Sequence, residues 1–305
     1  MPRVFIRYHT LTAPEGAAPT PFSSFIKENI VAHTTITYEK KDKVACITLN
    51  RPDKLNSINH AMMNELDEVY ADAENDPNVW TLIVSGNGRA LCSGADLSSS
   101  QAVNAKEGQP RGMPTRGEPL LARYWQWNAP QEASPPYRDM AKPIICAVNG
   151  IAAGAGLDLV TSSDIVIASD QATFFDPHVS VGIVSGREAV RLARVLPMNI
   201  ALRLVLMGKH ERMNAQRAFD LGLVSEVVPH DKLMERAWEI AGIVNKNAPL
   251  AVRGTRMAVR KGMALPVYEA ELLAESYRLR VAMTEDSREG PRSFVEKRSP
   301  QWQAK

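Results

Sequence analysis

The sequence predicts an α/β protein in which strands dominate the first part of the chain and helices the last. Short apolar runs bounded by turn residues recur between residues 35 and 175, as expected for buried strands. After Ser185, apolar residues instead recur at helical spacing. The chain has 305 residues, of which 45% are hydrophobic and 23% charged, and this composition is typical of a globular protein with a sizeable core.

The first elements follow one another closely. Residues 35–40 and 44–50 are expected to form two strands around a short turn, and Pro52 ends the second strand because proline cannot donate to a ladder. From Asn59, apolar residues at helical spacing predict a helix that stops near Asp76. The chain therefore begins with a strand pair followed by a helix.

The middle of the chain alternates strands with irregular segments. Residues 80–85, 144–148, 165–168 and 173–175 are expected to be strands, and a helix that begins in an Ala- and Gly-rich turn, from Ala152 to Leu159, lies between the second and the third. The stretch 98–138 has no regular periodicity, which is typical of functional lids or flexible loops.

Amphipathic spacing predicts a series of helices after Ser185. Their expected ranges are 186–196, 199–207, 214–221, 232–245, 249–261, 266–283 and 287–297.

Composition excludes several classes of function. The net charge of +2 gives no strong field for nucleic acid or a membrane surface, and no run is long and apolar enough to span a bilayer. Residues 1–34 lack hydrophobic periodicity and a compact apolar stretch, so we expect a loosely ordered N-terminal extension rather than a secretory signal. Cys46, Cys92 and Cys146 lie in apolar runs, and this pattern indicates reduced core thiols and a cytoplasmic location.

Two loops have the composition of an anion-stabilising site. Residues 89–97 follow a strand and are small around Gly94, so that a backbone N–H can approach a ligand. The helix start at Gly154 supplies free N–H groups and the positive end of a helix dipole. Two such donors aimed at one oxygen would form an oxyanion hole, which stabilises a developing negative charge.

With their flanks, these loops resemble the crotonase family, also called the enoyl-CoA hydratase/isomerase superfamily. The resemblance runs from Thr35 to the C-terminus and rests on residues 47–57, 93–97, 142–158, 172–174 and 294–298. It implies a crotonase-like ββα spiral core over residues 35–230 and a C-terminal helical trimerisation region over residues 231–305. It also implies an acyl-CoA thioester as substrate and a homotrimer or a dimer of trimers as the assembly.

The family pattern assigns roles to individual positions. By resemblance, the thioester oxygen would lie between the N–H groups of Ala95 and Ala155, although the family usually has glycine at the second position. Alanine still donates an N–H. The coenzyme A moiety would lie against Lys54, Leu55, Ser57, Asp96, Leu97 and Lys297. Coenzyme A is part of the substrate, so no separate cofactor is expected.

Proton transfer is the point where the chain departs from the family. Hydratases of this family use two glutamates, and the matching positions here are Asp158 and His178, which keep the family's separation of twenty residues. An aspartate keeps the carboxylate on a shorter side chain, and a histidine exchanges a proton near neutral pH. A carboxylate beside the imidazole would raise its pKa and orient it. Asp176 is a further candidate because it lies two residues from His178.

Three alternatives remain open beside hydration. Dienoyl-CoA isomerases of the family carry an aspartate at the position of Asp158, but also a further acid after the second site, where residues 181–186 have none. Some crotonases hydrolyse C–C bonds with an Asp/His arrangement, and the loss of both glutamates also fits an acyl-CoA-binding homologue with little catalysis. Cys92 has no activating base nearby in sequence, and no metal-ligand spacing occurs among the histidines.

Overall fold

The computed structural model describes residues 33–99 and 140–305. The expectation for the N-terminal extension falls outside these residues except at its last two positions. The expectation for the irregular stretch also falls outside them, apart from Ser98 and Ser99. No described helix has both the length and the apolar character needed to cross a membrane.

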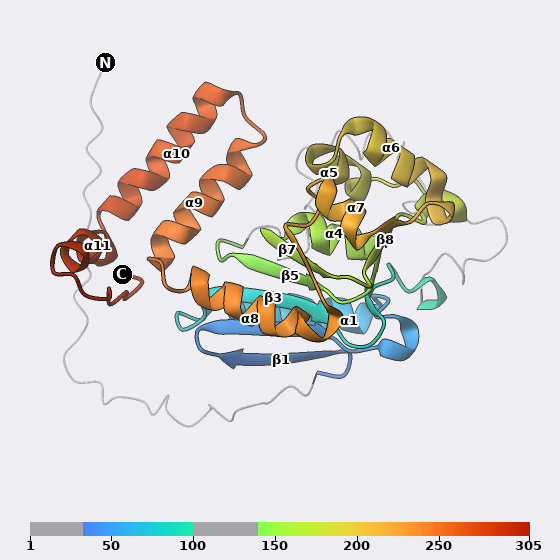
Figure 1. Ribbon diagram of the computed structural model, residues 1–305, viewed down its shortest axis with the longest axis horizontal. Coiled ribbons are helices and arrows are strands. Elements are labelled where there is room, and N and C mark those ends of the chain that lie inside the picture. Colours follow the sequence, from blue (N-terminus) through green and yellow to red (C-terminus); the bar gives the residue numbers. More distant parts are fainter. Residues whose placement is uncertain (1–32, 100–139) are drawn as a thin grey trace, which may run out of the picture. The chain divides into compact units, whose positions relative to one another are not determined.

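A six-stranded sheet forms the centre of the fold (Figure 1). Its order is β1-β2-β3-β5-β7-β10, with β1 and β2 antiparallel and every other pair parallel. The strands are β1 Ile36–Lys41, β2 Val44–Leu49, β3 Thr81–Gly86, β5 Ile144–Val148, β7 Ile165–Ser169 and β10 Glu226–Val228. Five of the six correspond to the predicted strands, and β10 was not predicted.

A second, four-stranded sheet contains shorter strands. Its order is β4-β6-β8-β9, and its members are β4 Ala90–Cys92, β6 Ile151–Ala153, β8 Thr173–Phe175 and β9 Met213–Asn214. The chain alternates between the sheets, from β3 to β4, from β5 to β6 and from β7 to β8. Each turn of the spiral therefore adds a strand to both sheets. Ala152 and Ala153, expected at the start of a helix, belong instead to β6 because they pair with Phe174 and Phe175 of β8.

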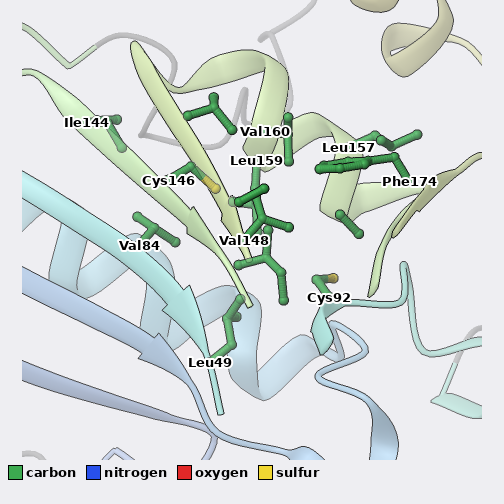
Figure 2. Packing of buried hydrophobic residues seen from close by; sticks show 14 of the residues in the cluster. Leu49, Val84, Cys92, Ile144, Cys146, Val148, Leu157, Leu159, Val160 and Phe174 are labelled. Atoms are coloured by element: carbon green, nitrogen blue, oxygen red, sulfur yellow. The ribbon is translucent and has the colours of Figure 1, made fainter. Parts of the chain in front are cut away.

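The strands β2, β3, β5 and β7 of the main sheet are largely buried on both faces, which explains their nearly continuous apolar runs. Along β5, Ile144, Cys146 and Val148 face a core shared with α1 (His60–Asn75) and α4 (Ala155–Ser162). Ile145 and Ala147 face the opposite way, toward α8 (Leu233–Val244). Figure 2 shows side chains from β2, β3, β5 and α4 meeting in the first of these cores.

The remaining α-helices follow β8, with β9 between the second and the third of them, and extend toward the C-terminus. They are α5 Arg187–Val195, α6 Met198–Met207, α7 Ala215–Asp220, α9 Pro249–Gly262, α10 Val267–Ala282 and α11 Glu285–Val295. Helices α9 and α10 pack side by side (Figure 1), yet α10 has no buried residue. Large apolar side chains on α10 and α11 are therefore exposed, with Phe294 at 85%.

Candidate active site

The first loop of the site is held by backbone hydrogen bonds to the segment before α1. Ser93 N–H donates to Leu55 O (3.0 Å), Ile58 N–H donates to Gly94 O (2.8 Å) and Asp96 N–H donates to Ile58 O (2.8 Å). Peptide groups alternate in direction along an extended chain. The Ala95 N–H therefore points away from Ile58.

The side chains of Asn56 and Arg51 fix the same segment. Asn56 is fully buried, and its amide donates to Asn87 O (2.9 Å) and Ala90 O (2.7 Å). The Arg51 guanidinium donates to Asp96 Oδ2 at 2.9 Å, so an ion pair crosses between the two loops. Within the described residues, these contacts make residues 53–57 and 93–97 one connected unit.

The second loop packs directly on the first. Gly94 and Gly154 have φ values of +111° and +51°, which side-chain-bearing residues rarely adopt. A Cβ placed on Gly94 would lie 3.9 Å from the Ala155 nitrogen, and one placed on Gly154 would lie 3.4 Å from the Gly94 Cα. The two glycine-containing turns are thus in contact, with Ala95 and Ala155 immediately after them.

Ala155 presents an N–H because it is the first residue of α4, where no preceding turn supplies an acceptor. Among the described residues, no hydrogen bond uses the N–H of Ala155 or that of Ala95. The start of α4 is fixed by Gly156, since a Cβ there would lie 2.4 Å from Cys92 O. This close approach locks the helix terminus against β4.

The ring of His178 lies against the second loop, next to Gly154. It begins a short 3-10 helix, His178–Val181, directly after β8. Its Cε1 lies 3.5 Å, and its Nε2 4.0 Å, from the point where a Cβ on Gly154 would sit. The imidazole therefore lies over the turn that precedes Ala155, with Nε2 on that side.

Asp176 holds the other nitrogen of this ring. Its side chain is 0% exposed, and its Oδ1 accepts hydrogen bonds from His178 Nδ1 (2.6 Å) and from the His178 backbone N–H (2.9 Å). Its Oδ2 accepts from the Ser185 hydroxyl at 2.5 Å. Because an ionised carboxylate only accepts hydrogen bonds, the Nδ1 of His178 carries a proton.

The electrostatics of this pair favour charge separation. The hydrogen bond to Asp176 raises the pKa of His178; burial opposes the rise, and the negative charges of Asp176 and Glu188 add to it. Burial alone would raise the pKa of Asp176, but hydrogen bonds from His178 and Ser185 lower it. Both shifts favour an imidazolium beside an ionised carboxylate.

Asp158 lies in the first turn of α4 and is 3% exposed. Its backbone N–H donates to Gly154 O (3.3 Å), so the helix turn that carries it starts from the residue under the His178 ring. Arg191 Nε, on α5, lies 3.7 Å from Asp158 Oδ1. Gly154 is thus the point where both candidate proton-transfer residues and the helix N-terminus converge.

Three nearby residues were not anticipated from the sequence. Ser185 donates a hydrogen bond to Asp176, Glu188 acts electrostatically on His178, and Arg191 lies beside Asp158. Glu188 is a buried acid only two residues beyond the stretch that was expected to lack one. None of them had a distinguishing sequence pattern, because an acid or an arginine on an amphipathic helix usually faces solvent.

Cys92 is part of the scaffold. It is fully buried, and burial raises the pKa of its thiol to about 12 although the Gly94 N–H acts in the opposite direction. Cys46 and Cys146 are also buried and free, as expected for core thiols. Within residues 33–99 and 140–305, no group of three or more His, Cys, Asp or Glu residues is placed to hold a metal ion.

The candidate coenzyme A residues fall into two places. Lys54 and Ser57 lie on the segment bonded to the first loop, beside Asp96 and the start of a short 3-10 helix, Leu97–Ser99. Lys297 lies just after α11, and Figure 1 shows that helix well apart from α4. The structure therefore groups the first set with the candidate oxyanion donors and leaves Lys297 separate.

A ββα spiral with two apposed glycine turns and a buried carboxylate defines a class of enzymes that bind acyl thioesters. The family model for enoyl-CoA hydratase/isomerase matches residues 39–305. This chain belongs to the enoyl-CoA hydratase/isomerase family, which confirms the resemblance in its loops.

Individual relatives agree with this assignment. The short-chain-enoyl-CoA hydratase of Clostridium acetobutylicum is 34% identical over 270 residues, which cover 86% of this chain and 95% of that protein. The mevalonyl-coenzyme A hydratase of Aspergillus fumigatus is 35% identical, over 85% of this chain and 91% of that protein. A crystal structure of an enoyl-CoA hydratase/isomerase from Mycobacterium paratuberculosis superposes with a TM-score of 0.77 at 59% identity. It covers 90% of this chain and 100% of that one, and confirms the predicted crotonase-like fold.

Proposed function

We propose that this protein adds water to the double bond of a 2-enoyl-CoA thioester. The observation that carries the proposal is the convergence at Gly154. The N–H groups of Ala95 and Ala155, the ring of His178 and the carboxylate of Asp158 all belong to segments that meet there. Relatives named as hydratases act on different acyl groups, so they support the reaction class rather than one substrate.

In the proposed reaction, the thioester oxygen accepts hydrogen bonds from Ala95 and Ala155. Asp158 takes a proton from water while the hydroxide adds to the β-carbon, and the electron pair of the double bond moves to the thioester oxygen as an enolate. The two N–H donors stabilise that charge, typically by about 3 kcal/mol for each donor. His178 then gives its Nε2 proton to the α-carbon and the carbonyl re-forms. A proton passed from Asp158 to His178 resets the site.

This division of roles follows from the electrostatics. The pKa of His178 is raised, which favours the protonated imidazole, and we assign this residue the role of proton donor. The buried Asp158 carboxylate lies beside the Arg191 guanidinium, and we assign it the role of base. The reaction needs no cofactor beyond the coenzyme A that the substrate carries.

We propose that coenzyme A binds along Lys54, Leu55, Ser57, Asp96 and Leu97. These residues flank the first loop, and Arg51 already neutralises Asp96, so the Lys54 ammonium remains for phosphate. Lys297 would then contact coenzyme A held by another copy of the chain, since α11 lies apart from this site within one chain.

The proposed assembly is a homotrimer or a dimer of trimers, in the cytoplasm. Exposed apolar side chains on the C-terminal helices favour self-association through this region, since such patches mark interaction surfaces; they include Val267, Tyr268, Met283, Phe294 and Val295. Sedimentation equilibrium tests the assembly. A monomer at micromolar concentration would contradict it.

The test of the reaction is hydration of crotonyl-CoA and of enoyl-CoA thioesters with longer or ring-bearing acyl groups, followed as loss of ultraviolet absorbance. Mass analysis of the product separates the alternatives, because hydration adds one water, isomerisation leaves the mass unchanged and C–C hydrolysis splits the acyl group. Failure to convert any member of the panel would contradict the proposal and favour an acyl-CoA-binding role.

Double-bond isomerisation is the second candidate. Glu188 favours it, because this buried acid acts electrostatically on His178 and could serve as the further acid that isomerases of the family carry. A product of unchanged mass from a dienoyl-CoA thioester, lost in Glu188→Gln, would select this reaction over hydration.

A further inference from the structure

We propose that Asp176 is a positioning residue that keeps His178 in the doubly protonated form and aims its Nε2 at the substrate, and that Ser185 fixes the Asp176 carboxylate. This inference rests on the proposed hydration. It adds a third and a fourth residue to the proton-transfer machinery, neither of which touches the substrate.

The geometry restrains His178 at two points. Asp176 Oδ1 accepts from the backbone N–H of His178 and from its Nδ1, so one oxygen fixes both the main chain and the ring. Pro177 between them restricts the backbone further because its ring limits φ, here −85°. Asp176 holds the Nδ1 of the ring, and the Nε2 lies on the side of the ring near Gly154, next to Ala155.

The second oxygen of the carboxylate is held as well. Ser185 donates to Asp176 Oδ2, and this serine stands two residues before α5. The same helix carries Glu188 and also Arg191, which lies beside Asp158. Residues 185–191 therefore contact Asp176 and Asp158 and act electrostatically on His178.

In this proposal, the His178–Asp176 pair takes the place of the second glutamate of the family's hydratases as proton donor. A carboxyl group can donate a proton only in its neutral form, whereas an imidazole donates from its cationic form and needs a nearby negative charge to stay protonated. Asp176 is completely buried and supplies that charge at 2.6 Å. Among the described residues, Asp176 and Glu188 are the charged groups that act on the imidazole.

Asp176→Asn tests the proposal in the full-length protein. Asparagine keeps an acceptor oxygen for both bonds from His178 but removes the charge, so the imidazole loses its proton at lower pH. We expect kcat to fall about tenfold or more at pH 8 and to recover most of its value near pH 6, with KM changed little. An equal loss at every pH would overturn the proposal.

Ser185→Ala is the matched control, because it removes one hydrogen bond to Asp176 and keeps the negative charge. We expect a smaller loss of kcat, of about two- to fivefold, and an alkaline limb of the pH profile at the wild-type position. If this variant moves the limb as far as Asp176→Asn does, the charge of Asp176 is not the cause and the proposal fails.

A titration by nuclear magnetic resonance separates this inference from the proposed reaction. The imidazole signals of His178, assigned with His178→Gln, should titrate at lower pH in Asp176→Asn than in the wild type, whether or not any enoyl-CoA is hydrated. An unchanged titration would overturn the role of Asp176. If Asp176→Asn does not fold, the wild-type spectrum decides, because an Nδ1 without a proton at neutral pH contradicts the proposal.

Discussion

The two halves of the candidate site consist of different chemical groups, which are backbone N–H groups in one half and side chains in the other. The proposed oxyanion side consists of backbone N–H groups at Ala95 and Ala155, next to close glycine contacts such as that of Gly156 with Cys92 O. The proton-transfer side consists of the side chains of Asp158 and His178, held by hydrogen bonds and charges. The position of the oxyanion donors is set by the backbone conformation. The proton-transfer groups are set by the identity of the side chains.

This difference explains how chemistry can vary within one scaffold. A backbone donor survives almost any substitution that preserves the local turn, as the alanine at position 155 illustrates. A proton-transfer group changes with a single residue, but its replacement requires new supporting contacts. Here His178 stands beside a buried carboxylate that carries the balancing charge.

The largest expected effect is on the side-chain half. His178→Gln keeps a polar side chain of similar length but cannot deliver a proton, so we expect kcat for enoyl-CoA hydration to fall by about 10²–10⁴-fold. The thermal midpoint should fall as well, because the fully buried Asp176 carboxylate loses its ion-pair partner. Steady-state kinetics and thermal melts measure both.

Retention of more than a tenth of the activity in His178→Gln would remove this residue from the mechanism. His210, which is exposed at the end of a short 3-10 helix, provides a control. His210→Gln should leave kcat within about twofold because the His210 side chain is exposed, although its 3-10 helix packs against the one that begins with His178.

The second prediction tests one of the two proposed backbone donors, the N–H of Ala155. Ala155→Pro removes the N–H at the first position of α4, where proline fits the helix geometry. We expect kcat to fall about 10²–10³-fold, as for the loss of one oxyanion donor. Ala155→Gly keeps the N–H and should hold kcat within about threefold. Equal losses in the two variants would show that the turn matters and the donor does not.

The sequence was sufficient to predict much of the fold and the family, whereas the oxyanion roles of Ala95 and Ala155 stay a prediction. The apolar strands β2, β3 and β5 were predicted because both faces of the main sheet are buried, which leaves long apolar runs. The family match in the enoyl-CoA hydratase/isomerase domain confirms the resemblance that located the two glycine loops.

The remainder depends on contacts between distant segments. β4 and β6 have three residues each, too few for a periodic pattern, and β6 forms because the chain pairs with β8. Arg191 reaches Asp158 only after α5 packs on α4. The sequence spacing of these two residues does not predict that packing.

A third prediction concerns the pH dependence of the side-chain half. The pKa of His178 is raised, so the protonated acid persists above its ordinary range and activity falls as the pH rises through that pKa. We expect log kcat to lose about one unit per pH unit on the alkaline limb. Ala155→Gly should have the same limb because the oxyanion half does not titrate. A limb that moves in this variant would contradict the separation of the two halves.

The smallest effect is expected at Cys92, which lies beneath the oxyanion half. Its thiol is fully buried, and burial raises its pKa to about 12, so it stays protonated and unreactive at neutral pH. Cys92→Ala removes one buried sulfur and should reduce the free energy of unfolding by about 1 kcal/mol, while kcat remains within about threefold of wild type. Alkylating agents should leave the folded enzyme active. Inactivation by such an agent that the Cys92→Ala substitution abolishes would instead assign the thiol a part in the chemistry, and the oxyanion half would no longer consist of backbone groups alone.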